Sequence, residues 1–121
     1  MKILIVDDNP ELLDMLKLIL INRGHTVIVA NDGDEAFRAY CDNPGIELTI
    51  TDKDMPGRNG LELIQGIKTI RNTARIWLIT GDIANFDKIR AGALEFGAEK
   101  VILKGGSGEL FDELKRHGLI K

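Results

Sequence analysis

The chain has 121 residues, 44% hydrophobic and 29% charged, a balance typical of one globular domain with its own apolar core. Its formal net charge of −3 argues against direct binding to nucleic acid, which needs a basic face. The single Cys41, expected to be a small packing residue, excludes an intrachain disulfide, and no apolar run suits a signal peptide or membrane span. We therefore expect a single cytoplasmic domain over residues 1–121, with no nucleic-acid or membrane partner.

Strand and helix signals alternate from one end of the chain to the other. Short aliphatic and β-branched runs predict strands at 2–6, 26–30, 47–51, 75–80 and 100–103. Apolar residues at helical spacing predict helices from Pro10 to about Gly24, then at 33–41, 60–70, 84–96 and 109–117. No repeat or linker divides them. Repeated strand–helix units predict an α/β fold, a doubly wound five-stranded parallel sheet with five helices.

Several helix ends carry recognisable capping residues. Asn9 is a good N-cap for the first helix, with Pro10 at its first position. Ser107 is the expected N-cap of the last helix, and Gly118 is its expected stop. Trp77 lies in a central strand and is expected to be part of the core.

Polar residues suited to phosphoryl chemistry follow four of the predicted strands. Asp7-Asp8 follows the first strand, Asp52 the third, Thr80 ends the fourth, and Lys104 follows the fifth. Because open parallel sheets place their sites at the carboxyl ends of the strands, these side chains are expected to meet at one edge. Such a set can hold a divalent cation, offer a carboxylate nucleophile and neutralise a phosphoryl group.

Each of these residues has an ordinary interpretation when it is taken alone. Asp7-Asp8 could begin a loop and cap a helix. Asp52 follows a buried strand and precedes a Pro/Gly turn, so we expect it in a fixed, exposed position, where alone it could be an ordinary turn aspartate. Thr80 could be a strand-terminal polar residue, and Lys104 could be solvated. A chance match at four strand ends is much harder to accept, so the joint pattern favours a functional site.

In its order and spacing the chain resembles the receiver domain of bacterial two-component response regulators, including the single-domain chemotaxis regulators. The resemblance rests on Asp7-Asp8, the segment 30–36, Asp52-x-x-Met55-Pro56 with Gly60, Thr80-Gly81, Gly97-Ala98 and Lys104. It covers essentially the whole chain. It implies the flavodoxin-like receiver topology, with strand order 2-1-3-4-5.

The resemblance also implies a role for each site residue. Asp52 would accept a phosphoryl group from the phosphohistidine of a sensor histidine kinase or phosphotransfer protein. Asp8 and Asp52 would ligate Mg²⁺ together with the backbone carbonyl of Asp54, and Asp7 would act through a bound water. Thr80 and Lys104 would contact the phosphoryl oxygens. The chain would assist its own phosphorylation and dephosphorylation, without being an enzyme that turns over an external substrate.

The chain departs from the family pattern at two positions. Gly105 stands where receivers usually carry a proline, so we predict a trans Lys104–Gly105 bond, because cis bonds before non-proline residues cost about 2.5–4 kcal/mol. Val101 stands where the family usually has a tyrosine or phenylalanine that changes rotamer, so we expect a weaker or different response on that face. Asp54 and Asp82 flank the site and could affect the phosphoryl lifetime in either direction.

Other functions remain open at this point. Asp52-Lys53-Asp54 followed by Thr80 could suggest a phosphatase of the haloacid dehalogenase type, but there the acid pair follows the lysine. A flavodoxin-like FMN carrier would need a phosphate-cradling loop where this chain has Asp7-Asp8. A receiver-like interaction module that works without phosphorylation is the third alternative. Since the sequence stops at Lys121, we expect a free-standing receiver or one excised from a larger protein, acting on a downstream target or a fused output domain.

Overall fold

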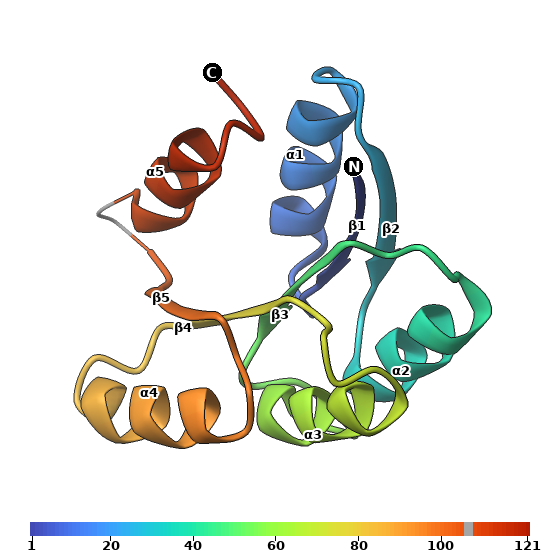
Figure 1. Ribbon diagram of the computed structural model, residues 1–121. Coiled ribbons are helices and arrows are strands. Elements are labelled where there is room, and N and C mark those ends of the chain that lie inside the picture. The colour runs from blue at the N-terminus through green and yellow to red at the C-terminus, as the bar shows by residue number, and fades with distance from the viewer. Residues whose placement is uncertain (106–107) are drawn as a thin grey trace.

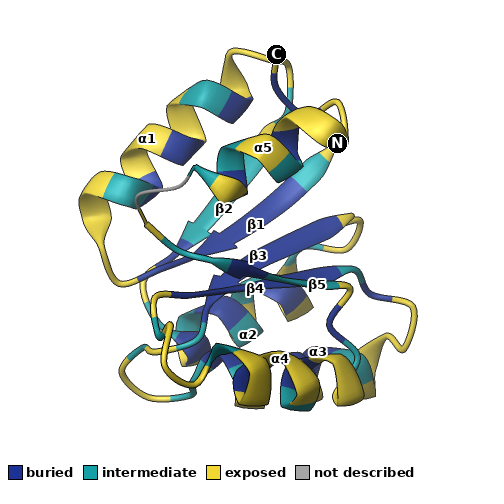
Figure 2. Ribbon diagram, turned by 90° about the vertical axis from the view of Figure 1, so that its left-hand side faces the viewer, coloured by how far each residue is buried: buried dark blue, intermediate teal, exposed yellow. Residues whose placement is uncertain are grey.

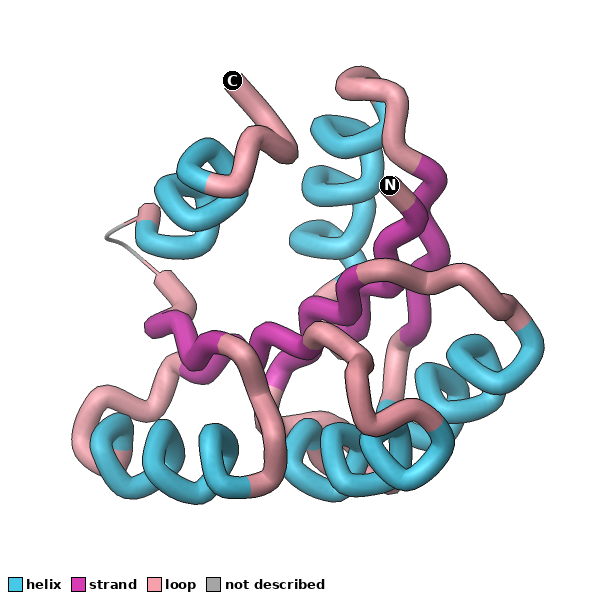
Figure 3. The backbone as a smooth tube through the Cα atoms, viewed as in Figure 1, coloured by secondary structure: helices cyan, strands magenta, loops and turns pink. Residues whose placement is uncertain are grey.

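The computed structural model describes residues 1–105 and 108–121, and it contains one five-stranded sheet in which strands and helices alternate. The strands are β1 (Lys2–Val6), β2 (Thr26–Ala30), β3 (Leu48–Asp52), β4 (Ile76–Thr80) and β5 (Lys100–Leu103). The helices are α1 (Pro10–Ile21), α2 (Gly33–Asp42), α3 (Gly60–Ile70), α4 (Phe86–Glu95) and α5 (Glu109–Arg116). Figure 3 shows the strands as a twisted central layer between the helices.

All neighbouring strands are parallel, and their spatial order is β2-β1-β3-β4-β5. Helices α1 and α5 cover one face of the sheet, and α2, α3 and α4 cover the other (Figure 1). This is the doubly wound fold that the sequence pattern predicted, with the strand order that the resemblance implied. From β1 the chain passes to β2 on one side of the sheet and then to β3 on the other side of β1. The carboxyl ends of β1 and β3 therefore flank the crevice where such folds place their sites.

The sheet separates two apolar cores, one beneath each helical layer. Figure 2 shows the central strands as buried and the outer faces of the helices as exposed. The core on the α1 and α5 side includes Trp77, which is fully buried as predicted. Because β1, β3 and β4 are packed on both faces, their carboxyl ends are held rigidly, which suits a site that needs fixed geometry.

Most predicted boundaries are confirmed to within one or two residues. Asn9 caps α1 by accepting from the backbone N–H groups of Glu11 and Leu12. Helix α1 ends at Ile21, earlier than predicted. Two other shifts lie near the site: β3 extends to Asp52, and α4 begins at Phe86 instead of residue 84. Residues 82–85 form a turn in which the Asp82 carboxylate accepts from the Asn85 N–H, and this turn takes the place of a first helical turn.

Two of the sequence predictions concern the loop between β5 and α5. The predicted cap at Ser107 lies outside the described residues, and α5 is preceded by Gly108 in a left-handed conformation. The described residues contain no cis peptide bond, so the trans bond predicted between Lys104 and Gly105 is confirmed.

Cys41 is exposed, so its expected packing role was wrong. Within the described ranges, none of the helices has the length and apolar character needed to cross a membrane.

Candidate site at the carboxyl edge of the sheet

The strand registers bring the predicted site residues to one edge of the sheet. Asp7 directly follows β1, Asp52 ends β3, and Thr80 ends β4. Asp52 pairs with Ile79, one residue before Thr80, and Lys104 comes one residue after the partner of Thr80 in β5. The expectation that these side chains share an edge is therefore correct.

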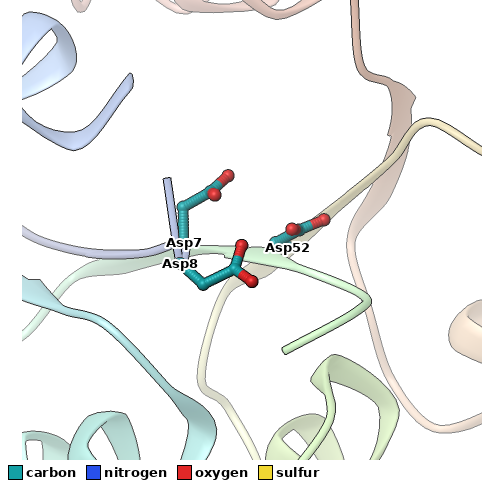
Figure 4. Close-up of side chains that lie close together, drawn as sticks. All are labelled: Asp7, Asp8 and Asp52. Atoms are coloured by element: carbon teal, nitrogen blue, oxygen red, sulfur yellow. The ribbon is translucent and has the colours of Figure 1, made fainter. Parts of the chain in front are cut away.

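Three carboxylates converge at this edge. One oxygen from each of Asp7, Asp8 and Asp52 lies within 4.8 Å of the others. Figure 4 shows the three side chains gathered around a common space, the first two from the end of β1 and the third from β3. Asp7 is fully buried and Asp8 is exposed, whereas Asp52 is only 6% exposed. The exposed position expected for Asp52 was wrong, because this residue is still part of a strand that is buried along its whole length.

Lys104 supplies the positive charge at this edge. Its Nζ donates to Asp7 Oδ2 at 2.8 Å and to Asp52 Oδ2 at 3.2 Å. Burial alone would lower the pKa of Lys104, but its bonds and charge interactions with Asp7 and Asp52 outweigh burial and raise the pKa above its ordinary value. The amine therefore stays charged at neutral pH. A solvated lysine, the ordinary interpretation, is not what the geometry shows.

The ionised carboxylate of Asp52 is destabilised in this arrangement. Burial raises the pKa of its carboxyl, the neighbouring charge of Asp7 raises it further, and Lys104 offsets only part of the shift. One ammonium thus faces three carboxylates. A hard divalent cation that prefers oxygen ligands would relieve this excess of negative charge, and the donor set fits Mg²⁺ in number and chemistry.

Thr80 is fully buried beside the cluster. Its Oγ1 accepts a hydrogen bond of 3.2 Å from the Asp82 N–H. The Asp82 carboxylate in turn accepts from the side chain and backbone of Asn85, and these bonds lower the pKa of Asp82. These bonds fix the Thr80 hydroxyl at the strand end through the loop that follows it.

Asp54 lies apart from the three converging carboxylates. Its side chain is 72% exposed, and its Oδ1 pairs with Lys53 Nζ at 3.1 Å. This does not bear on the contribution predicted for Asp54, which is made by its backbone carbonyl. Lys53 is partly buried, and its Nζ pairs with Asp54.

Two contributions to the site went unnoticed in the sequence. The first is the pairing of Lys104 with Asp7, which has no local signature because the two residues are 97 positions apart. The second is Arg58, which connects the loop after Asp52 to helix α2. Gly33 carried the available signal for Arg58, since a Cβ there would overlap the Arg58 carbonyl oxygen.

Comparisons with known proteins define the class to which this fold and site belong. Residues 3–115 match the family described as the response regulator receiver domain, and the chain belongs to this family. The chain is 35% identical over 103 residues to the transcriptional regulatory protein CpxR of Escherichia coli strain K12, covering 85% of this chain and 42% of CpxR. It is 38% identical over 103 residues to the regulatory protein VanR of Enterococcus faecium, covering 85% of this chain and 43% of VanR. The chain therefore spans less than half the length of these curated relatives.

Solved structures agree with this membership. A response regulator receiver domain from Clostridium thermocellum has a TM-score of 0.80 at 27% identity, covering 98% of this chain and 97% of its own. The response regulator TrrA from Thermotoga maritima, solved in complex with Mg²⁺-BeF, has a TM-score of 0.78 at 28% identity and covers 98% of both chains. The CheX–CheY complex with BeF3 and Mg²⁺ from Borrelia burgdorferi gives a TM-score of 0.84 at 25% identity, covering 99% of this chain and 90% of that one.

Proposed function

We propose that the chain is a phosphoacceptor switch in which Asp52 takes a phosphoryl group from a phosphohistidine in a Mg²⁺-dependent reaction. The observation that supports this most strongly is the convergence of Asp7, Asp8 and Asp52 around one space, with the Lys104 ammonium on Asp52 Oδ2. Phosphoryl transfer depends mainly on positioning and charge neutralisation, so this set needs no separate general base.

The proposed metal ligands are the carboxylates of Asp8 and Asp52 and the backbone carbonyl of Asp54, with Asp7 acting through a bound water. Bound there, Mg²⁺ would neutralise charge and so allow an anionic nucleophile to meet an anionic donor. The exposed Asp8 faces the open side of the cluster, and the buried Asp7 is already paired with Lys104. This division agrees with the proposed direct and water-mediated roles.

The protein groups perform the remaining steps. An oxygen of the ionised Asp52 forms a bond to phosphorus while the bond from phosphorus to the donor imidazole nitrogen breaks, and the nitrogen keeps that electron pair. Lys104, held between Asp7 and Asp52, can transfer one of its hydrogen bonds to a phosphoryl oxygen. Thr80 would donate its hydroxyl hydrogen to another phosphoryl oxygen, while one of its two lone pairs accepts from the Asp82 N–H.

The biological setting is proposed from the same family. The phosphodonor would be a sensor histidine kinase or a phosphotransfer protein, and the output a change in binding to a downstream protein or fused output domain. We propose one domain over residues 1–121, located in the cytoplasm, with no direct nucleic-acid or membrane partner and no turnover of external substrates. Val101 is half-buried against the core on the α2, α3 and α4 side, and its small side chain supports the proposed weaker response.

The test is labelling by a small phosphodonor such as phosphoramidate, with and without Mg²⁺, in the native chain and in Asp52→Asn. We expect Mg²⁺-dependent label in the native chain and none in the variant. Persistent label in a folded Asp52→Asn would refute the assignment of the nucleophile. A native chain that binds Mg²⁺ but takes no label would favour the interaction module that works without phosphorylation.

A further inference from the structure

The loop of residues 53–59, between Asp52 and helix α3, is well fixed only at its two ends. At its start, the Lys53 N–H donates to the Ile79 carbonyl at 2.9 Å, and the Gly60 N–H donates back to the Lys53 carbonyl at 2.8 Å. At its end, Asn59 and Glu62 form a capping box. No backbone hydrogen bond joins residues 54–58 to the rest of the described chain. Side-chain contacts must therefore hold the middle of this loop.

Arg58 makes two of these contacts, both to helix α2. Its guanidinium carbon lies 4.1 Å from the centre of the Phe37 ring in α2, within the range of a cation–π interaction. Its Nε lies 3.6 Å from Asp34 Oδ1, at the start of the same helix. A planar guanidinium can stack on a ring and face a carboxylate at once, which a lysine cannot do. One side chain thus joins the loop to α2 by two different interactions.

Three glycines leave room for this arrangement. A Cβ at Gly33 would overlap the Arg58 carbonyl oxygen, and a Cβ at Gly57, where φ is +72°, would lie 2.7 Å from Asp34 Oδ2. A Cβ at Gly66, inside α3, would lie 2.9 Å from both the Phe37 ring and the Arg58 guanidinium. Glycine inside a helix is unfavourable relative to alanine, so Gly66 is explained by the close approach of this stack.

We propose that Arg58 is a positioning residue for the phosphoacceptor site, acting as a latch that holds the loop of residues 53–59 on α2. This inference rests on the proposed function, because that loop carries the Asp54 carbonyl assigned as a metal ligand. Met55 is partly buried against the apolar core on the α2, α3 and α4 side and also helps to hold the loop. Arg58 alone joins this loop to the charged start of α2 in the part of the chain that the structure describes.

The latch links α2 to the metal site. When it is intact, the backbone of Asp54 is ordered before the metal arrives, so less conformational freedom is lost on binding. Without it, residues 54–58 become mobile on the picosecond-to-nanosecond timescale and the metal must order them. The expected result is weaker metal binding, with the site side chains themselves unchanged.

The experiment compares native chain, Arg58→Ala and Arg58→Lys with the control Arg38→Ala, which removes an exposed arginine from the same helix α2. In metal-free protein we expect ¹⁵N order parameters at residues 54, 55, 57 and 58 to fall from about 0.85 towards about 0.6 in Arg58→Ala. A Mg²⁺ titration followed by amide shifts should show a Kd about fivefold weaker, less than the ten- to hundredfold typical of lost outer-shell partners, because Met55 still packs. Arg58→Lys should recover only part of the order parameters and of the Mg²⁺ affinity, and Arg38→Ala should match the native chain.

A purely structural role for Arg58 would lower the unfolding temperature but leave the order parameters and the Mg²⁺ Kd unchanged, and that result would overturn the proposal. If Arg58→Ala does not fold, Phe37→Leu removes the stacking ring while keeping an apolar side chain, and it should give the same changes at about half the size. The order parameters need neither metal nor phosphodonor. A native chain that takes no label would therefore refute the phosphoacceptor role. The order parameters would still test whether Arg58 holds the loop on α2.

Discussion

Replacing Asp52 with asparagine is predicted to stabilise the fold at neutral pH in the absence of metal. The substitution keeps the size and shape of the side chain and removes one negative charge from the buried site. The pKa of Asp52 is raised in the fold above its ordinary value of 3.8, mainly by burial and then by Asp7. The folded state therefore holds this proton more tightly than the unfolded state, so ionised Asp52 reduces stability as the pH rises from about 3.8 through its folded pKa.

The distances give the size of the effect. At an effective dielectric constant of about 20, the Lys104 ammonium 3.2 Å away attracts the Asp52 carboxylate by about 5 kcal/mol. Because an oxygen of Asp7 lies within 4.8 Å of one of Asp52, Asp7 repels it by at least about 3.5 kcal/mol, and the solvated Asp8 adds about 1 kcal/mol. Desolvation of the carboxylate costs a few kcal/mol more. The balance is a net penalty of roughly 1–2 kcal/mol, or roughly 3–8 °C in the unfolding temperature of a domain of this size.

Urea denaturation of the two proteins in chelator at pH 7 measures this difference, with Asp14→Asn as the control, since Asp14 is an exposed carboxylate on α1. The advantage of Asp52→Asn should shrink as the pH falls towards 3.8, because Asp52 then becomes protonated in both states. Mg²⁺ at ten times its Kd should stabilise the native chain by about 1.4 kcal/mol and the variant by less. A metal-free variant that is less stable than the native chain at pH 7 would contradict the electrostatic account.

Three further predictions concern other parts of the molecule. Lys104→Met leaves Asp7 buried without its partner and should destabilise the metal-free fold by about 3 kcal/mol, measured by urea denaturation; a loss below 1 kcal/mol would show that the pair is not needed. Glu99→Gln should lose at most about 1 kcal/mol at pH 7, because the Gln side chain still accepts from the Trp77 indole but no longer pairs with Arg75. Burial would raise the pKa of Glu99, but the bonds from Arg75 and Trp77 prevail and lower it, so the native advantage should disappear as the pH falls below 4.5; an advantage that persists in acid would argue against the pair. Gly60→Ala should cost about 1–3 kcal/mol in thermal unfolding, because its Cβ would overlap the Asp52 carbonyl, and an unchanged unfolding temperature would mean that the loop adjusts freely.

The fold and the main site residues were accessible from sequence for a specific physical reason. Buried parallel strands read as continuous apolar runs, and four of these runs end at or next to a residue suited to phosphoryl chemistry. Alternation with helices then fixed a parallel sheet, whose strand ends share one edge. The convergence of Asp7, Asp8 and Asp52 follows from that topology without any knowledge of side-chain contacts.

The details that sequence missed depend on contacts distant along the chain. Asp52 was expected to be exposed, yet it pairs in register with Ile79 and is enclosed by neighbouring strands. The late start of α4 depends on a hydrogen-bonded turn at Asp82, whereas apolar spacing reports only the buried side of a helix. The stack of Arg58 on Phe37 joins a loop to another helix, so neither residue signals it locally.

The central claim is that Asp52 itself becomes phosphorylated. After exposure to phosphoramidate and Mg²⁺, borohydride reduction converts an acyl phosphate to a stable alcohol that peptide mass mapping can locate. The account predicts reduction at Asp52 alone, dependent on Mg²⁺ and absent without the phosphodonor. Reduction at Asp7, Asp8 or Asp54 in place of Asp52, or none at any residue of a folded chain that binds Mg²⁺, would contradict it.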